Sequence, residues 1–274
     1  MRLKKILKSI LGVIRPVNKT IASITYTTPN NRLKGMGIII TGGGRGLGAA
    51  MAEKFVNEGA NILIAGRNEN TLKETANKIG CHYLVLDIAN VDSFDKFLDD
   101  AASKIGSVNG LVNNAGISLH ESTFFDVTPE TFDSQVSVNM RGGYFLTQKL
   151  TKRWIDKGQK GNILFVSSET GDMMDFRPYG FTKVAVNSMV QGLAYLFAKQ
   201  GIRINAVAPG VTMSEMTGKR ATDNIYHSKN MLERLYMPEE VAETSCFLMS
   251  EVSGCISGQI ITCNNAKSIN ARWK

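Results

Sequence analysis

The chain has few of the residues that hold disulfide scaffolds and structural metal sites together. Its 274 residues include 4 cysteines and 3 histidines. The cysteines show no C-x-x-C spacing and no histidines cluster near them, so we expect no metal site and a reducing compartment, the cytoplasm. They are Cys81, Cys246, Cys255 and Cys263. No stretch approaches 18 uninterrupted apolar residues, which argues against a membrane-spanning helix.

Acidic residues are missing from the first part of the chain. The net charge is +8, and no Asp or Glu precedes Glu53. Eight of the 32 basic residues fall in the first 34 positions, which leaves 24 basic against 24 acidic residues in the rest. The basicity therefore belongs to an N-terminal extension, residues 1–34. The neutral body gives no support for a nucleic-acid-binding face.

The N-terminal extension carries an amphipathic pattern. Apolar residues recur at helical spacing: Leu3, Ile6, Leu7, Ile10, Leu11 and Ile14. Basic residues lie off this stripe, and Pro16 ends it. Three interpretations stay open. The segment is a helix that packs on its own body or on a sister subunit, a basic helix on an anionic membrane surface, or a cleaved organellar presequence.

From residue 35 onward, short β-branched runs alternate with longer helical patterns. The runs lie at 37–41, 61–66, 82–86, 110–116, 162–168, 203–210 and 259–262, and the helical patterns at 46–58, 69–79, 92–105, 130–157, 179–199 and 238–249. The runs are almost continuously apolar, as expected for strands covered by helices on both faces. This alternation predicts an α/β fold, a Rossmann-type doubly wound parallel sheet of about seven strands in one domain, residues 35–274. Residues 211–237 break the rhythm and are expected to form a lid or substrate loop.

A glycine-rich segment, "TGGGRGLG" at 41–48, follows the first strand and opens the first helix. Gly42, Gly46 and Gly48 stand where the turn is tight and where side chains would keep the backbone away from a pyrophosphate. The N–H groups and the dipole at the helix start would face that anion. The segment therefore predicts a dinucleotide-binding loop; the alternative is a structural turn.

The end of the second strand bears on the choice of nucleotide. A carboxylate about 20 residues past the loop would select NAD through the ribose 2′-hydroxyl. The strand instead ends in "AGRN" with Arg67, while Arg45 lies inside the loop and Glu69 falls in the next helix. Two cations suit a 2′-phosphate, so we expect NADP(H) rather than NAD(H). The alternative is that both arginines are merely solvated.

Two tyrosines precede a lysine by four residues. Tyr179 begins a helix shortly after the strand that ends at Ser168, so Tyr179 and Lys183 are expected at the carboxyl ends of the strands, beside the cofactor. Tyr195 and Lys199 lie further along the same helix and are expected at the opposite rim, in a structural role. Tyr179 and Lys183 are therefore the candidates for acid–base chemistry.

Six motifs follow one another along the chain: "TGGGRGLG", "NNAG" at 113–116, "VNMRG" around Asn139, Ser168, Tyr179-x-x-x-Lys183 and "PG" at 209–210. In this order they resemble the short-chain dehydrogenase/reductase family, and the resemblance covers residues 35–265. It implies a catalytic tetrad of Asn139, Ser168, Tyr179 and Lys183. It also implies cofactor contacts from Gly42, Gly44, Arg45, Gly46, Leu47, Gly48, Arg67, Asp87, Ile88, Asn114, Ala115, Gly116, Tyr179, Lys183, Pro209, Gly210 and Thr212.

Within that set, the resemblance gives individual roles to some residues. Asp87 would contact the adenine, Asn114 to Gly116 would support the ribose region of the nucleotide, and Thr212 would contact the carboxamide end. The segment "SGQIIT" at 257–262 resembles the last strand of the family, which commonly contributes to dimer and tetramer contacts. We therefore expect a homodimer or homotetramer.

The chain departs from the family pattern at three places. Only 11 positions separate Ser168 from Tyr179, fewer than usual, which makes Ser167 a rival for the role of Ser168, although the residues after Ser168 match the family's S-x-x-G. The "NNA" at 264–266 stands where many members carry an acidic, glycine-rich ending. The N-terminal extension has no counterpart in the family.

The tetrad implies reduction of a ketone or 3-oxoacyl group by NADPH, with Tyr179 as the proton donor. The ordinary pKa of tyrosine is about 10, and the nearby charge of Lys183 is expected to lower the pKa of Tyr179 by roughly 3 units. Ser168 would orient the carbonyl oxygen, and Asn139 would position a backbone group or a water that connects Lys183 to solvent. Two alternatives stay open: a catalytically silent NADP(H)-binding regulatory or scaffold protein, and the same chemistry in a membrane-associated lipid or glycan pathway.

Overall fold

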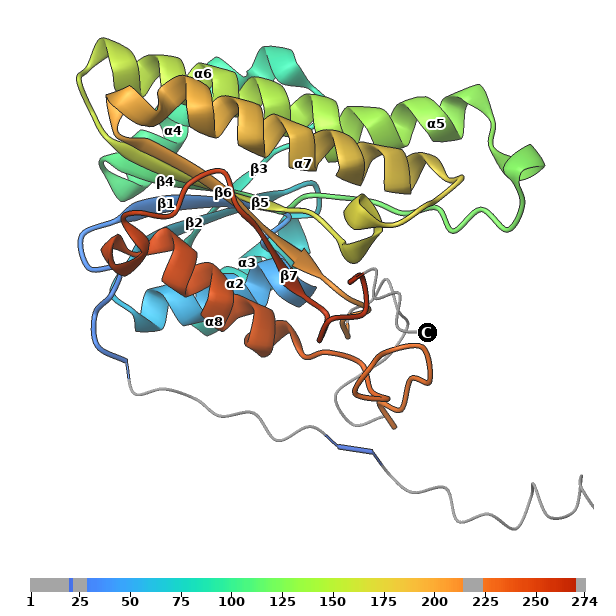
Figure 1. Cartoon of the computed structure of the whole chain (residues 1–274). Coiled ribbons are helices and arrows are strands. Elements are labelled where there is room, and N and C mark those ends of the chain that lie inside the picture. The colour runs from blue at the N-terminus through green and yellow to red at the C-terminus, as the bar shows by residue number, and fades with distance from the viewer. Residues whose placement is uncertain (1–19, 22–28, 214–223, 270–274) are drawn as a thin grey trace, which may run out of the picture.

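A seven-stranded parallel sheet forms the centre of the molecule (Figure 1). The computed structural model describes residues 20–21, 29–213 and 224–269. The strands are β1 (Gly37–Thr41), β2 (Asn61–Gly66), β3 (His82–Val85), β4 (Val108–Asn113), β5 (Gly161–Val166), β6 (Ile202–Pro209) and β7 (Ile260–Cys263). Their order is β3-β2-β1-β4-β5-β6-β7, and every neighbouring pair is parallel. The structure confirms the doubly wound α/β fold.

Helices cover both faces of the sheet (Figure 1). One face carries α4 (Phe94–Ile105), α5 (Pro129–Val136), α6 (Gly142–Asp156) and α7 (Pro178–Phe197), and the other carries α2 (Gly46–Asn57), α3 (Glu69–Ile79) and α8 (Pro238–Met249). Ile39 of β1 belongs to the first core, with Trp154 of α6. Its neighbours Ile38 and Ile40 belong to the second core, with Phe55 of α2. Because both faces are covered, the strands read as continuous apolar runs.

The single helical region expected at 130–157 is interrupted. Between α5 and α6 lies a π-helical turn, Ser137–Arg141, which carries the buried Asn139. A Cβ on Gly142 would lie 2.2 Å from the backbone oxygen of Ile88, so the start of α6 passes directly against the loop after β3. A π turn inserts one extra residue into a helical turn and often marks a functional position. It hardly changes the spacing of the apolar residues along the sequence. The sequence pattern therefore could not show it.

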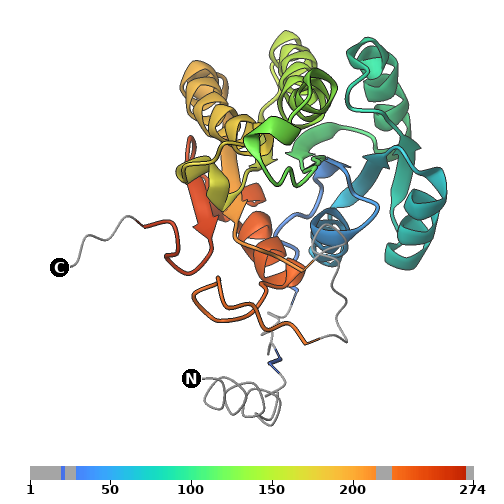
Figure 2. The same ribbon diagram turned by 90° about the vertical axis from the view of Figure 1, so that its right-hand side faces the viewer.

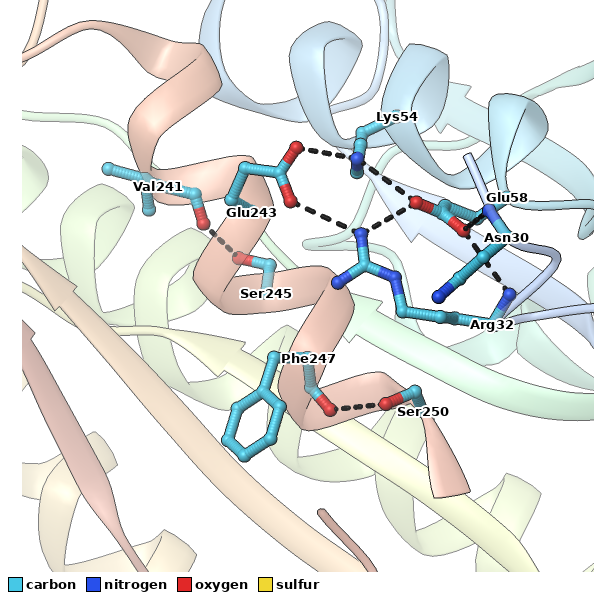
Figure 3. Close-up of polar contacts among 9 residues, drawn as sticks. All are labelled: Asn30, Arg32, Lys54, Glu58, Val241, Glu243, Ser245, Phe247 and Ser250. Atoms are coloured by element: carbon cyan, nitrogen blue, oxygen red, sulfur yellow. Dashed lines mark hydrogen bonds and ion pairs between the residues drawn. The ribbon is translucent and has the colours of Figure 1, made fainter. Parts of the chain in front are cut away.

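A buried ion cluster anchors the residues that precede the sheet (Figure 3). The side chain of Glu58, just after α2, is fully buried and accepts hydrogen bonds from the backbone N–H groups of Asn30 and Arg32. Arg32 Nη2 lies 2.6 Å and Lys54 Nζ 3.0 Å from Glu58 Oε1. Glu243 of α8 pairs with the same two cations. Burial alone would raise the pKa of Glu58, but the hydrogen bonds from Arg32 and Lys54 lower it to about 2.

This cluster joins the end of the N-terminal extension to α2 and α8. Leu33 is fully buried beside it, so residues 30–33 pack on the domain although the sequence pattern placed them in the extension. The amphipathic stripe at 3–14 lies outside the described residues. In the ranges that the structure covers, no helix is long and apolar enough to cross a membrane.

The segment expected to form a lid, 211–237, is described at both ends and not at 214–223. Thr212 forms an isolated bridge with Tyr236. The hydroxyl of the buried Tyr236 donates to the backbone oxygen of Asn264, 2.7 Å away. The described part of this segment is therefore tied to the turn after β7, at the carboxyl edge of the sheet.

Candidate active site

The candidate residues gather at the carboxyl edge of the sheet, which Figure 2 shows from the front. The loops that follow β1, β4, β5 and β6 meet there. In doubly wound sheets this edge is where ligands bind. The glycine loop and the beginning of α7 with Tyr179 both lie at this edge, as the sequence predicted.

The loop after β1 has a backbone that its glycines make possible. Gly42 and Gly46 adopt left-handed φ angles of 65° and 53°, which favour glycine. A Cβ on Gly48 would lie 2.3 Å from the Gly42 oxygen, so the first turn of α2 packs directly on the loop. No acidic residue stands in that first turn, whose leading N–H groups have no intrahelical partners. The loop therefore fits a phosphate group of a dinucleotide.

The end of β4 holds this loop in place. Asn114 Nδ2 donates to the backbone oxygens of Thr41 and Gly42, at 2.9 and 3.0 Å. The N–H groups of Asn114 and Ala115 both donate to Thr41 Oγ1 at 3.1 Å. The side-chain amide of Asn114 thus holds the glycine loop through two hydrogen bonds. Thr41, which the sequence reasoning did not single out, is the acceptor that joins the loop to the end of β4.

Other residues expected to contact the cofactor lie along the same edge. Arg45 is exposed at the N-cap of α2, and Arg67 is exposed directly after β2. After β3, Asp87 is exposed and its Oδ1 accepts from the N–H of Ala89 at 3.0 Å, whereas Ile88 is buried. Because β1 and β2 are neighbours, the two arginines lie in the segments that follow adjacent strands.

The expected contacts on the opposite side of the site follow β6. This strand ends at Pro209, and the N–H of Gly210 donates to the backbone oxygen of Cys263 at 3.0 Å. Thr212 Oγ1 donates to the oxygen of Gly210 at 2.9 Å. The hydroxyl of Thr212 therefore has a partner within the chain.

Tyr179 and Lys183 lie one turn apart at the start of α7. Lys183 Nζ is 5.4 Å from the centroid of the Tyr179 ring and donates to the backbone oxygen of Val166, 2.8 Å away at the end of β5. The lysine is only 4% exposed. Burial lowers the pKa of Lys183 to about 8.

Asn139 connects this pair to the loop after β4. Its Oδ1 accepts from the N–H of Ile117 at 2.8 Å, and its Nδ2 donates to the Ile117 oxygen at 2.9 Å. The Nδ2 also donates to Thr182 Oγ1 at 3.2 Å. A Cβ on Gly116 would lie 3.5 Å from Asn139 Oδ1 and 3.8 Å from Lys183 Nζ, so these three residues are close neighbours.

The two serines after β5 have different partners. Ser168 interacts with the Tyr179 phenol and lowers the pKa of Tyr179, against the larger effect of burial, which raises it. Ser167 Oγ instead donates to Asn187 Oδ1 at 2.6 Å, within α7. Of the two, Ser168 is the one beside the tyrosine.

The pKa of Tyr179 moves in the direction opposite to the one predicted. Burial of the phenol raises the pKa of Tyr179, and the interaction with Ser168 and the charge of Arg177 oppose this rise without cancelling it. The prediction of a lowered pKa is wrong for this structure. The spacing in the sequence reveals the charge of Lys183, but it does not reveal how much water the folded chain removes from around the ring.

The second pair, Tyr195 and Lys199, is far from this arrangement along α7. Tyr195 is 90% exposed, and Lys199 follows in a short 3₁₀ turn that ends at Gly201, with φ 70°. Neither side chain faces the carboxyl edge of the sheet where Tyr179 lies, because they stand at the opposite end of a 20-residue helix.

Sequence reasoning missed the contacts that close the short interval between Ser168 and Tyr179. Asp175 accepts hydrogen bonds from Arg177 Nε and Nη2, each at 2.8 Å. A Cβ on Gly180 would lie 2.4 Å from the Cβ of Asp175, so the loop passes directly over this glycine. Gly180, directly after Tyr179, was the available signal in the sequence, but it did not reveal that Asp175 packs against it.

The family model described as enoyl-(acyl carrier protein) reductase matches residues 42–265. The chain belongs to the short-chain dehydrogenase/reductase family. The match begins inside the glycine loop and extends past β7, so it includes all four residues of the expected tetrad.

Two family members with assigned activities are similar over most of their length. The L-rhamnose 1-dehydrogenase (NADP(+)) of Thermoplasma acidophilum is 30% identical over 249 residues, which cover 86% of this chain and 98% of that protein. The 3-oxoacyl-[acyl-carrier-protein] reductase of Aquifex aeolicus is 30% identical over 243 residues, covering 85% and 97%.

A solved structure shares the fold closely. The 3-ketoacyl-(acyl-carrier-protein) reductase from Brucella melitensis complexed with NADH has a TM-score of 0.80 and 33% identity, and the similarity covers 86% of this chain and 100% of that one. This short-chain dehydrogenase/reductase is therefore an oxidoreductase whose fold binds a nicotinamide dinucleotide.

Proposed function

We propose that the protein reduces a carbonyl group, in a ketone or a 3-oxoacyl substrate, to a hydroxyl with NADPH. The observation that supports this most directly is the contact between Ser168 and the Tyr179 phenol, with the buried Lys183 one turn further along α7. This group lies at the same edge of the sheet as the glycine loop. A purely nucleotide-binding protein has no use for a buried ammonium beside a phenol.

The residues of the chain divide the reaction between them. Bound NADPH would supply the hydride to the carbonyl carbon. Tyr179 donates its phenolic proton to the carbonyl oxygen, and Ser168 donates a hydrogen bond to that oxygen as negative charge develops on it. The hydride and the proton together give the hydroxyl, and the phenolate of Tyr179 takes its next proton from solvent.

The shifted pKa values suit this direction. A raised pKa keeps the Tyr179 phenol protonated at neutral pH, which is the form that donates a proton. Lys183, whose pKa burial lowers to about 8, still carries its charge at pH 7 and stabilises the phenolate that each turnover leaves. Asn139 acts by holding the backbone of Ile117 next to this pair.

The choice of NADP(H) over NAD(H) rests on the two exposed arginines. Arg45 and Arg67 stand after the adjacent strands β1 and β2, where the adenosine ribose of a dinucleotide is expected to lie. A 2′-phosphate would gain charge-assisted hydrogen bonds from them. Among the relatives, one is named for NADP(+) and one solved structure holds NADH, so the preference of this chain depends on its own residues.

The substrate is proposed to be largely apolar. Three exposed apolar side chains, Met173, Met174 and Phe176, lie in the loop between Ser168 and Tyr179. A substrate whose carbonyl reaches Tyr179 would pass beside this loop. The 3-oxoacyl class is also the one named for two of the similar proteins.

A second proposal concerns the surroundings of the enzyme. From the basic amphipathic stripe at 3–14 we propose that the protein is cytoplasmic and binds peripherally to an anionic membrane surface. There it would act in a lipid or glycan pathway.

We also propose a homodimer or homotetramer, because α7 exposes Phe181, Val184 and Leu196. Light scattering after size exclusion would test the assembly.

A carbonyl-substrate panel with NADPH tests the main proposal, with Tyr179→Phe as its blank. The panel should contain ketones and 3-oxoacyl thioesters of increasing chain length, and NADPH oxidation is followed at neutral pH. The variant should lose turnover and keep NADPH affinity, and Tyr195→Phe should match the wild type in both. Oxidation of no substrate, with NADPH still bound, would favour a silent binding protein instead.

A further inference from the structure

The turn after β7 reaches across to the loop that carries Ser168. Lys267 Nζ donates to Glu169 Oε1 at 2.5 Å, and Asn264 Nδ2 donates to Glu169 Oε2 at 3.2 Å. Glu169 directly follows Ser168, which caps the short helix that Glu169 begins. The hydroxyl of Tyr236 donates a hydrogen bond to the backbone oxygen of Asn264. Lys267, 98 positions further along the chain, and its neighbour Asn264 thus bind Glu169, the residue next to the candidate catalytic serine.

The backbone of this turn is strained. Asn265 and Ala266 adopt φ angles of 50° and 67°, in the left-handed region that glycine favours. The turn is closed by a hydrogen bond from the N–H of Lys267 to the Asn264 oxygen, 3.3 Å long. Consecutive non-glycine residues in this region persist where surrounding contacts hold them, and such strain concentrates at functional sites.

The carboxylate of Glu169 is enclosed on several sides. Glu169 is 5% exposed and Asn264 1%. A Cβ on Gly210 would lie 3.1 Å from Glu169 Oε2, so the loop after β6 closes that side. Burial raises the pKa of Tyr236, and the charge of Glu169 adds to the rise. A carboxylate in such a place needs a counter-charge, and Lys267 provides it.

Three charged groups shift the pKa of the Tyr179 phenol, and a fourth lies over its ring. Burial raises the pKa of Tyr179 most, Arg177 lowers it, and Asp175 and Glu169 raise it further. Lys183 lies over the ring from the same helix. The charge of Glu169 therefore opposes the phenolate that the proposed reaction forms, unless a cation compensates for it.

We propose that Lys267 is a positioning residue of the active site, which acts through Glu169 by fixing the segment next to Ser168 and by neutralising the Glu169 charge beside Tyr179. The inference rests on the proposed function for its meaning in turnover. Its electrostatic part can be measured without turnover.

The direct test is the titration of Tyr179 in the full-length protein labelled with ¹³C at the tyrosine ζ carbons. The resonance of Tyr179 is assigned by its absence from Tyr179→Phe. The titration is repeated in Lys267→Met, Glu169→Gln, the double variant and Lys267→Arg. Thermal unfolding of each variant shows that the comparison is made on folded protein.

The two single changes should move the midpoint in opposite directions. Lys267→Met leaves the Glu169 charge uncompensated and should raise the midpoint by about half a pH unit or more, whereas Glu169→Gln should lower it. The double variant should return close to the wild type, and Lys267→Arg should not depart from it. In the pH profile of kcat, the same variants should shift the basic limb in the same order, with smaller changes in KM.

Unchanged midpoints, or shifts of the same sign in both single variants, would overturn the inference, because loss of packing alone does not depend on the sign of the charge removed. If Lys267→Met does not fold, the opposite shift in Glu169→Gln decides the question. A wild type that reduces no carbonyl would overturn the proposed function and leave the titration result standing, so the two failures are distinguishable.

Discussion

The ammonium of Lys183 donates its hydrogen bond to the backbone oxygen of Val166, at 2.8 Å, while it stands 5.4 Å from the centre of the Tyr179 ring. The lysine is therefore held by the end of β5 and not by the tyrosine. Its side chain is almost fully buried and no carboxylate pairs with it among the described residues. A charge placed in this way costs stability.

Replacement of Lys183 by methionine should abolish turnover and stabilise the fold. Burial lowers the pKa of Lys183 from 10.5 to about 8, so the unfolded chain holds this proton more tightly than the folded protein. Below pH 8 the folded protein bears the full cost of the buried charge, about 3 kcal/mol. Between pH 8 and 10.5 that cost disappears, because the folded side chain becomes neutral.

Urea unfolding at pH 7 and pH 10 measures this difference. Lys183→Met should be more stable than the wild type at pH 7, and the gap should narrow at pH 10. The exposed Lys199 offers a matched control at the other end of α7, where Lys199→Met should stay within about 0.5 kcal/mol at both pH values. A variant that is less stable at pH 7 would contradict the assigned cost.

Exchange of Arg45 and Arg67 for alanine should weaken NADPH far more than NADH. Each guanidinium would lose a charge-assisted contact with the 2′-phosphate, which NADH lacks. We expect NADPH affinity to fall by about tenfold or more per arginine, and NADH affinity to change by less than about threefold. Titration of intrinsic fluorescence with both dinucleotides measures this.

The exposed Lys78, in the last turn of α3 at the far end from the cofactor edge, provides the control cation. Lys78→Ala should leave both affinities unchanged. Equal losses for NADPH and NADH in the arginine variants would reject the 2′-phosphate interpretation and leave the arginines as general contributors to binding.

Glu58→Gln should destabilise the protein by about 3–5 kcal/mol, because it leaves Arg32 and Lys54 without their buried partner (Figure 3). The pKa of Glu58 is lower in the folded protein, about 2, than its ordinary 4.5. The carboxylate therefore contributes stability above pH 4.5, and that contribution is lost as the pH falls toward 2.

Thermal unfolding from pH 7 to pH 3 follows this loss. The difference between wild type and Glu58→Gln should be largest near neutral pH and shrink in acid. Asp156, which pairs with Lys152 on the exposed surface of α6, is the matched control. Asp156→Asn should cost less than about 1 kcal/mol, and a similar cost at both sites would refute the role of burial.

The parts of this molecule that were predictable from sequence are those encoded locally. Apolar runs gave the strands, and the glycines at 42, 46 and 48 marked a loop whose φ angles and close packing other residues cannot adopt easily. The position of Tyr179 at a helix start after β5 placed it at the carboxyl edge. The separation of the two Tyr–Lys pairs to opposite ends of the molecule followed from the geometry of one long helix.

The parts that could not be predicted depend on contacts between distant residues. Glu169 and Lys267 are 98 positions apart, and nothing near either residue points to the other. The direction of the pKa shift of Tyr179 is decided by burial, which exists only in the folded chain. The ion pair between Glu58 and Arg32 likewise brings residues 30–33 into the domain. Composition alone had grouped these residues with the basic extension.

Removal of residues 1–28 should abolish binding to anionic membranes without harming the fold. The deletion leaves Arg32 and Leu33, which pack on the domain, so the melting temperature should stay close to that of the full chain. Sedimentation with vesicles of mixed phosphatidylcholine and phosphatidylserine should retain the full chain, less so at high salt, since lysines beside an apolar stripe bind through both charge and burial. Exchange of Lys4, Lys5 and Lys8 for glutamine should reduce vesicle binding to a level between those of the full chain and the shortened chain. Equal partitioning of full and shortened chains would reject membrane binding, and a change in oligomeric state or melting temperature on deletion would instead favour packing on the body or on a sister subunit.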